Sequence, residues 1–312
     1  MDLFCPSCNS NNIIRLGEIP SGNLFAGRTL DYSLPGGCLY RCKVCHLYFR
    51  WPRLSKRKLD ELYKEADPNN WQYKPTHRKD WKLAATWLNS KLVQGKILDI
   101  GCWDGKFLDY LGKNWQGFGV EINEVALQKA KERGITILEK NFNELHKISV
   151  YFDVVVAFDV IEHTENPMFF LEQMARLTRT NGFIIISSGN TDALTWKISG
   201  SKYWYCAIPE HISFINVNWC YFAATKLNLK VEYVERFSHA GKRNLAQFLL
   251  DTIENATYLA SPSLFRKLRK IKNIYLCPKN INNMNYPPPW GTSKDHLIII
   301  FSKNKPLGKF FR

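Results

Sequence analysis

The sequence has no apolar run long enough to cross a membrane. Its longest runs, such as "FDVVVAF" and "FIIIS", have the length of a strand, whereas a membrane-spanning helix needs about 20 apolar residues. The chain begins "MDLFCPSC", which lacks the basic start and the apolar stretch of a secretory signal. We therefore expect a cytoplasmic protein. In that compartment nine cysteines indicate metal binding or free thiols before disulfides.

Acidic side chains are nearly missing from the end of the chain. Residues 261–312 hold 11 basic residues and one acidic residue, and residues 1–95 hold 15 basic and 8 acidic residues. Residues 96–260, with 17 basic and 19 acidic residues, are close to neutral. The net charge of +15 therefore sits in the flanks, which argues against a protein built to lie along a nucleic acid. The basic amphipathic stretch 263–275 suits a solvated helix, which we favour, or a peripheral contact with the inner membrane surface.

Two C-x-x-C pairs stand near the N-terminus, Cys5-Pro-Ser-Cys8 and Cys42-Lys-Val-Cys45. Two such turns can close a tetrahedron of thiolates around a structural zinc ion. The 33 residues between the pairs predict a large projecting loop, and Cys38 is near enough to be a spare ligand. Unliganded thiols are the alternative, but the repeated spacing argues against them. A thioredoxin-like redox role lacks the surrounding βαβ pattern.

The chain divides into four zones. Residues 1–50 form the predicted zinc-binding module, and residues 51–95 form a helical linker in which Ser55 can cap the first helix. Residues 96–240 alternate short apolar runs with helical patterns, which predicts a mostly parallel α/β sheet of the Rossmann-like type. In it we expect a long helix over 166–182. Residues 241–312 are predicted as a basic helical extension followed by a final strand, "HLIIIFSKN".

The sequence also lacks the G-x-G-x-x-G spacing with which a dinucleotide fold holds a pyrophosphate. The segment "ILDIGCWDGKFLDYL" instead has a strand that ends in Asp99, then Gly101 and Gly105 before a helix. Glycine lets the backbone turn sharply beneath a ligand, and a carboxylate here suits a cationic ligand. Glu121 ends the next strand, where it can hold both hydroxyls of a ribose. A Rossmann-type sheet with an ordinary tight turn is the alternative.

This segment resembles the first motif of the class I S-adenosylmethionine-dependent methyltransferases. The resemblance implies that Asp99, Gly101 and Gly105 surround the methionine moiety, that Glu121 binds the ribose, and that Asn141 and Phe142 lie by the adenine. The full set of cofactor-binding residues that it implies is Asp99, Gly101, Cys102, Trp103, Gly105, Glu121, Ile122, Asn141, Phe142 and Phe158. One position departs from the pattern, because Trp103 replaces the middle glycine of the family's loop.

The stretch "FDVVVAFDVIEHTENP" is similar to the fourth strand of many small-molecule methyltransferases of this class. By that resemblance Phe158 and Asp159 border the sulfonium and the acceptor. Glu162 and His163 are either catalytic or part of the packing under the sheet, and the sequence leaves both open. The N/D-P-P-Y/F sequence of methyltransferases that act on base amines is missing here, and "NYPPPW" stands too late to replace it.

The segment after the fifth strand, "SGSKYWYCAIPEHISF", falls where open α/β sheets bind their ligands. Methyl transfer to a hydroxyl or an acidic carbon needs a base, and histidine suits neutral pH. We take His211 as that base, with Glu210 as its orienting partner or an alternative base, and His239 as a weaker second candidate. A packed Glu–His pair is the competing interpretation. Further candidate substrate contacts are Asn190, Tyr203, Trp204 and Tyr205.

A zinc module joined to this domain resembles enzymes that methylate nucleotide-activated deoxysugars, and methyltransferases of bacterial surface-polysaccharide synthesis. The resemblance covers most of residues 1–240. It implies O- or C-methylation of a small acidic acceptor, a nucleotide sugar or a lipid-linked sugar. An RNA methyltransferase is the second hypothesis, although the loop 9–41 holds only Arg15, Arg28 and Arg41. A non-catalytic, zinc-stabilised binding protein is the third.

Overall fold

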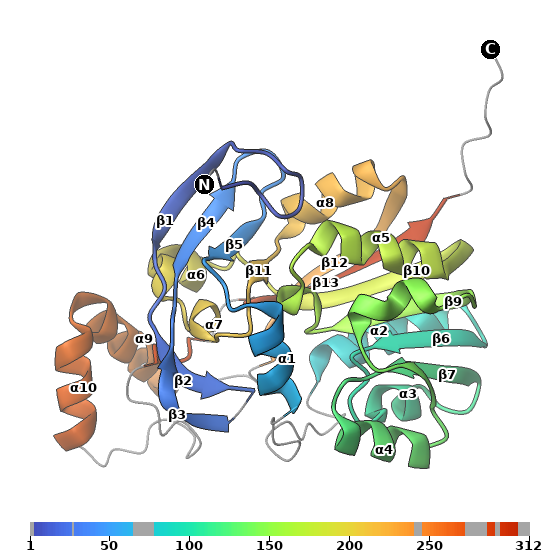
Figure 1. Ribbon diagram of the computed structural model, residues 1–312, viewed down its shortest axis with the longest axis horizontal. Coiled ribbons are helices and arrows are strands. Elements are labelled where there is room, and N and C mark those ends of the chain that lie inside the picture. Colours follow the sequence, from blue (N-terminus) through green and yellow to red (C-terminus); the bar gives the residue numbers. More distant parts are fainter. Residues whose placement is uncertain are drawn as a thin grey trace.

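The computed structural model describes residues 3–26, 28–64, 78–239, 245–271, 286–290 and 294–304. Its main element is a seven-stranded sheet in the order β8-β7-β6-β9-β10-β13-β12 (Figure 1). The strands are β6 (Gly95–Ile100), β7 (Trp115–Val120), β8 (Thr136–Glu139), β9 (Phe152–Phe158), β10 (Thr178–Gly189), β12 (Leu229–Phe237) and β13 (His296–Lys303). The first five are parallel, and β13 is antiparallel to both its neighbours. The predicted Rossmann-like α/β class is confirmed.

Helices cover both faces of this sheet, so its central strands are apolar on both sides, as parallel sheets require. In β9, Val155 and Ala157 face the core beneath α5 and α8, whereas Val154 and Val156 face the core beneath α2 and α3. The helices are α1 (Lys56–Lys64), α2 (Lys79–Lys91), α3 (Lys106–Leu111), α4 (Glu124–Glu132), α5 (Pro167–Leu177), α6 (Leu194–Ser199), α7 (Trp204–Ala207), α8 (Val217–Lys226), α9 (Leu245–Ala260) and α10 (Pro262–Ile271), with short 3-10 turns η3 (Phe142–Lys147), η4 (Ile161–His163) and η5 (Gly200–Lys202).

The predicted helix over 166–182 is wrong at its C-terminal end. α5 stops at Leu177, and Thr178 already pairs with Phe152 in the sheet. The register then shifts before Phe183, with Asn181 in the left-handed region at a φ of 62°. β-branched threonines favour the extended backbone, and Gly182 lies inside β10 where a Cβ would be 2.8 Å from the Asp153 carbonyl oxygen.

The final strand is the element whose place the sequence did not predict. β13 lies between β10 and β12, inside the sheet of the methyltransferase-like zone. Residues 241–295 therefore connect two strands that are neighbours in one sheet, rather than forming an extension after it. The division of the chain into domains stays a prediction.

The N-terminal residues form a four-stranded sheet, β1-β4-β5-β11, and a hairpin, β2-β3. Their bounds are β1 (Ile13–Glu18), β2 (Gly22–Phe25), β3 (Arg28–Leu34), β4 (Cys38–Cys42), β5 (Tyr48–Trp51) and β11 (Ser213–Phe214). β11 comes from the segment that follows β10. The predicted acceptor region therefore contributes one strand to the sheet of the predicted zinc module. Trp219 of α8 donates to the Ser7 hydroxyl at 2.9 Å, which joins the module to the main core.

Two helix predictions can be compared with the structure. Ser55 caps α1 as expected, because its hydroxyl accepts from the Lys58 amide at 3.3 Å. In α10, Phe265 is buried but Leu264 and Leu268 are exposed, so these residues do not share one packed face. Tyr275, the last residue of the predicted amphipathic stretch 263–275, lies outside the described residues. Within the part of the chain that is described, no helix combines the length and the apolarity that a membrane span requires.

Candidate active site

A cavity of about 880 Å³ opens at the carboxyl ends of β6, β7 and β9. This volume lies near the upper end of the range for ligand pockets, about 300–1,000 Å³. Its walls come from the loops after these strands, from α1 and the start of α2, and from the hairpin β2-β3. Nine of the ten predicted cofactor-binding residues line it, and the tenth, Gly105, stands behind the loop at the start of α3.

The loop between β6 and α3 takes its shape from three left-handed residues. Gly101 and Gly105 both have a φ of 75°, and a Cβ on Gly101 would lie 2.6 Å from Val160. Trp103, which replaces the expected glycine, adopts a φ of 50°. A left-handed backbone costs a residue with a side chain about 1–2 kcal/mol. The tryptophan therefore keeps the conformation that glycine would have, and its indole becomes part of the cavity wall.

Two buried carboxylates face the cavity from the ends of β6 and β7. Glu121 accepts from the Asn123 amide at 2.7 Å and from the Trp103 amide at 2.9 Å, and burial raises its pKa to about 7. Burial and the neighbouring charge of Glu121 raise the pKa of Asp99 well above its usual range. The Oδ1 atom of Asp99 is buried without a hydrogen-bond partner. These two carboxylates fit a ligand with cationic groups and vicinal hydroxyls, such as S-adenosylmethionine.

His211 and Glu210 both line the cavity, but they do not form the expected pair. Glu210 Oε1 accepts from the Ala26 amide at 2.8 Å, while its Oε2 is buried without a partner. The partner of His211 is the Tyr205 carbonyl oxygen, 3.1 Å from Nδ1. A carbonyl can only accept, so Nδ1 carries the proton and Nε2 keeps the lone pair. Burial holds the pKa of His211 well below its usual value, so the ring is neutral at pH 7.

Tyr203 and Asn190 are not where the sequence placed them. Tyr203 lies outside the cavity lining, stacked on Trp196 at 4.8 Å between ring centroids, and its hydroxyl donates to the Trp290 carbonyl at 3.2 Å. Asn190 donates to the Lys294 carbonyl at 3.0 Å, also away from the lining. The polar groups of both residues are already used in packing. Trp204 and Tyr205 do line the cavity, as predicted.

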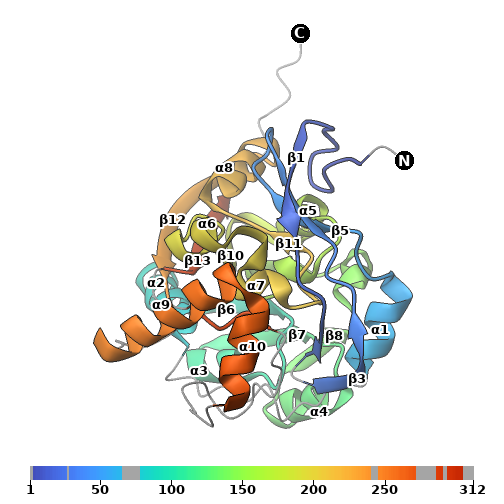
Figure 2. The same cartoon turned by 90° about the vertical axis from the view of Figure 1, so that its left-hand side faces the viewer.

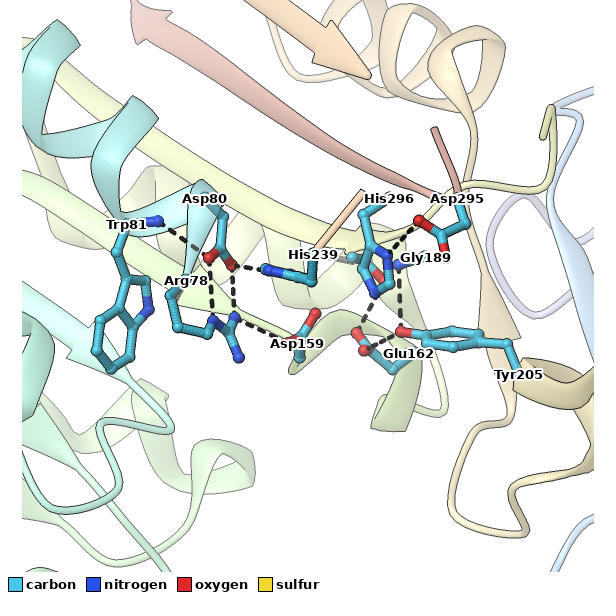
Figure 3. A network of polar contacts seen from close by, with 11 residues as sticks. Arg78, Asp80, Trp81, Asp159, Glu162, Gly189, Tyr205, His239, Asp295 and His296 are labelled. Atoms are coloured by element: carbon cyan, nitrogen blue, oxygen red, sulfur yellow. Dashed lines mark hydrogen bonds and ion pairs between the residues drawn. The ribbon is translucent and has the colours of Figure 1, made fainter. Parts of the chain in front are cut away.

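Glu162 is the centre of a buried hydrogen-bond network (Figure 3). It accepts from the Tyr205 hydroxyl at 2.5 Å and from the Ser188 hydroxyl at 2.9 Å, and burial raises its pKa to about 7. The Gly189 amide donates to the Tyr205 hydroxyl at 3.1 Å. The network joins the loop after β9 to the end of β10 and to α7. These hydrogen bonds fix the position of the Glu162 side chain, which also lines the cavity.

His163, the neighbour of Glu162, contacts two other parts of the chain, α1 and the segment that holds Glu210 and His211. Its Nδ1 lies 2.8 Å from the Tyr63 hydroxyl of α1 and 3.1 Å from the Glu210 carbonyl oxygen. Its ring centroid is 4.9 Å from that of His211. Burial lowers the pKa of His163 as well, so two neutral imidazoles lie next to each other at the cavity wall.

An ion-pair network that was not predicted lies at the start of α2, in the stretch predicted as a helical linker. Arg78 Nη2 lies 2.5 Å from Asp80 Oδ2 and 2.8 Å from Asp159 Oδ2 (Figure 3). Burial would raise the pKa of Asp159, but the Arg78 charge outweighs it and lowers that pKa to about 2. His239, the second candidate base, lies beside the network with Nε2 3.9 Å from Asp80. The sequence Arg78-Lys79-Asp80, before an apolar helix, was the signal from which this network could have been predicted.

The hairpin β2-β3 is the second missed part of the site. It belongs to the long stretch between the two C-x-x-C pairs, and it brings Leu24 and Ala26 to the cavity wall. The Tyr286 hydroxyl lies 3.2 Å from the Leu24 amide and 3.0 Å from its carbonyl oxygen. The predicted loop between the two pairs therefore exists, and part of it lines the cavity.

The four cysteines of the C-x-x-C pairs come together at the N-terminal sheet. Their sulfurs all lie within 4.8 Å of one another, with 3.4 Å between Cys5 and Cys45 and 3.5 Å between Cys8 and Cys42. The Val44 and Cys45 amides point at the Cys42 sulfur. Four thiols in this arrangement fit a tetrahedral zinc ion. Cys38 is not a spare ligand, because its sulfur contacts the Arg15 guanidinium at 3.3 Å instead.

Comparison of the sequence with known proteins finds methyltransferases. A family model described as a methyltransferase domain matches residues 54–233. The ubiquinone biosynthesis O-methyltransferase of Rickettsia conorii is 33% identical over 124 residues, covering 37% of this chain and 42% of that protein. That of Thiobacillus denitrificans is 26% identical over 166 residues, covering 49% of this chain and 71% of that protein. The chain thus spans less than half of the first relative and more than two thirds of the second.

Solved structures give a more distant likeness. The magnesium protoporphyrin IX methyltransferase of Synechocystis, solved with bound SAH, aligns with a TM-score of 0.47 at 12% identity, over 73% of this chain and 84% of that one. This likeness is too weak to bear on function. The family match covers more than half of the sequence and includes the cavity's loops. The chain therefore belongs to the methyltransferase-domain family and is an S-adenosylmethionine-dependent methyltransferase.

Proposed function

We propose that the enzyme transfers a methyl group to a hydroxyl oxygen of a small ring-shaped acceptor, with His211 as the general base. The observation that carries this proposal is the fixed tautomer of His211, whose Nδ1 is held by the Tyr205 carbonyl. Its unprotonated Nε2 can take the hydroxyl proton as the oxygen attacks. The names of the two curated relatives, both O-methyltransferases, support oxygen as the accepting atom.

On the cofactor side, we assign Asp99 to the methionine moiety and Glu121 to the ribose hydroxyls. Asn141 and Phe142 line the cavity beyond Glu121 and would contact the adenine, while Phe158 and Asp159 would border the sulfonium. The cofactor supplies an already activated methyl group, so the protein has to align the acceptor and remove one proton. The Arg78 ion pair holds the Asp159 carboxylate ionised next to that position.

The acceptor side suits a hydroxylated ring. Trp204 and Tyr205 offer aromatic surfaces, and the unpartnered Oε2 of Glu210 can accept from a second hydroxyl. The lysines and arginine among the described lining residues all have carboxylate partners: Arg78 with Asp159, Lys106 with Asp104, and Lys140 with Glu124. This charge balance supports an uncharged ring inside the cavity, and a sugar unit is our first candidate. Any diphosphate carrier of that sugar would lie outside the cavity. An intermediate of ubiquinone biosynthesis is the second candidate, on the names of the relatives.

We further propose that Cys5, Cys8, Cys42 and Cys45 bind a structural zinc ion. The support is the mutual approach of the four sulfurs and the amides aimed at Cys42. Zinc would fix the turn that ends β4 and the turn that precedes β1. It takes no part in the proton transfer.

The test is transfer of an isotopically labelled methyl group, followed by mass spectrometry, into sugars, nucleotide sugars, ubiquinone precursors and RNA. We expect an O-methylated ring product. The matched variants are His211→Ala and His239→Ala. The first should lower kcat by about 100-fold or more while leaving the cofactor Kd nearly unchanged, and the second should retain most of the rate. An unchanged kcat in His211→Ala, or a labelled RNA product, would overturn the proposal.

A further inference from the structure

Helix α9 is oriented with its apolar side toward solvent. Leu245 and Ile253 are 73% and 61% exposed, and Phe248 and Leu249 on the same side are also exposed. The side that faces the protein carries Asp251 and Asn255, which are only 7% and 4% exposed. A surface helix of a globular protein has the opposite pattern. Contiguous exposed apolar side chains of this kind mark an interaction site.

The buried polar residues of α9 bond within the helix, and contacts at its C-terminal end fix its orientation. Asp251 accepts from the Gln247 side-chain amide at 2.8 Å, and Asn255 donates to the Asp251 carbonyl at 2.8 Å. One turn further on, the buried Tyr258 packs edge-to-face on Phe265 of α10, at 5.5 Å between ring centroids. Lys202 donates to the Leu259 carbonyl from the methyltransferase side. The contacts of Tyr258 with Phe265 and of Leu259 with Lys202 join α9 to other elements, so rotating the helix to bury its leucines would break them.

The adjoining helix adds positive charge to the apolar surface. α10 buries Phe265 against α9 and leaves Leu264 and Leu268 exposed, together with the exposed Lys267 and the half-buried Arg266. Figure 2 shows both helices on the same outer side of the molecule, in front of α7 and the sheet. In the sequence, residues 261–312 hold 11 basic residues and one acidic residue.

We propose that the exposed sides of α9 and α10 bind the surface of an anionic membrane. The apolar side chains would enter the boundary between headgroups and acyl chains, and the basic side chains would lie at the lipid phosphates. A second copy of the chain is a poorer occupant. A twofold interface pairs the same patch with itself, so it would bring the basic α10 helices of two strongly cationic molecules together, and like charges at an interface are unfavourable.

The experiment is co-sedimentation of the full-length protein with phosphatidylcholine vesicles that contain about 30% phosphatidylglycerol, and with phosphatidylcholine vesicles alone. The anionic vesicles should bind the protein, and raised salt should weaken the binding. The double variant Leu249→Glu and Ile253→Glu should lower the partition coefficient by about tenfold or more, since it removes apolar area and adds negative charge.

The matched control carries the same substitutions at exposed valines elsewhere, Val93→Glu and Val125→Glu. Val93, before β6, is 83% exposed, and Val125 lies on the surface of α4. This control should bind vesicles with at most a small loss from its added charge. Equal loss of binding in both double variants would overturn the proposal. A second result would also overturn it. In that result the wild-type protein binds neither kind of vesicle but forms a dimer by light scattering, and the Leu249→Glu and Ile253→Glu double variant is monomeric.

Discussion

Glu121 combines a buried position with two backbone donors, and this balance sets how it responds to pH. Burial raises its pKa to about 7, while the Asn123 and Trp103 amides favour the carboxylate. The cofactor's positive charge and its ribose hydroxyls also favour the carboxylate. The pKa of Glu121 should therefore be lower in the complex than in the free protein, and binding below pH 7 should release a proton.

The cofactor Kd should consequently rise as the pH falls through 7, becoming about tenfold larger at about pH 6 than at about pH 8. Calorimetry in two buffers of different ionisation enthalpy measures both the Kd and the proton release. Glu121→Gln is isosteric and cannot ionise, so it should bind more weakly at pH 8 and show a flat dependence. An unchanged slope in that variant would assign the titration to another group, Asp99 first.

Single residues also mark the limit of what the sequence could predict. The acidic positions of the cofactor loop were predictable because they end apolar strands, and parallel strands bring such ends together at one edge of the sheet. Tyr203 and Tyr205 could not be told apart, because which of two nearby aromatics faces a cavity depends on the turn of α7. The roles of Glu210 and Tyr205 around His211 likewise depend on contacts with the hairpin β2-β3 and on backbone carbonyls.

At the scale of elements, β13 joins β12 to β10 and so to the rest of the sheet. Its five consecutive apolar residues, Leu297 to Phe301, are fully buried between β10 and β12. Burying each such side chain contributes about 1.5–3 kcal/mol, and a whole domain has a net stability of only about 5–15 kcal/mol. A chain truncated after Asp295 should therefore lose its cooperative thermal transition by circular dichroism.

Truncation after Asn304 is the control for that experiment, since it leaves β13 complete and should melt like the full chain. Retention of a cooperative transition without β13 would show that the sheet is stable with β12 unpaired and β10 paired with β9 alone. The strand itself was predicted from "HLIIIFSKN", but its position was not. Periodicity reports the type of an element, whereas strand order depends on pairings between segments far apart in the chain.

For the whole molecule, strand pairing and hydrogen bonds join the cysteine cluster to the predicted acceptor region. β5 follows the second C-x-x-C pair and pairs with β11, with Tyr48 opposite Phe214. Arg50 of β5 is buried and donates to the Ile208 carbonyl at 3.0 Å, the Pro209 carbonyl at 3.1 Å and the Cys206 carbonyl. These carbonyls belong to the segment that carries Glu210 and His211. The hairpin β2-β3 leaves the same N-terminal sheet and contacts Glu210 through Ala26.

Loss of the proposed zinc ion should therefore affect the acceptor more than the cofactor. Chelation, or the variant Cys8→Ser, should lower the thermal midpoint and raise the acceptor KM by about tenfold, with a much smaller change in the cofactor Kd. Cys38→Ser is the matched control, because Cys38 lies outside the cluster and contacts Arg15. Metal analysis should find one zinc ion per chain in the wild type and less in Cys8→Ser. A metal-free wild type with an unchanged midpoint, or identical behaviour of the two serine variants, would refute the zinc site and its link to the acceptor side.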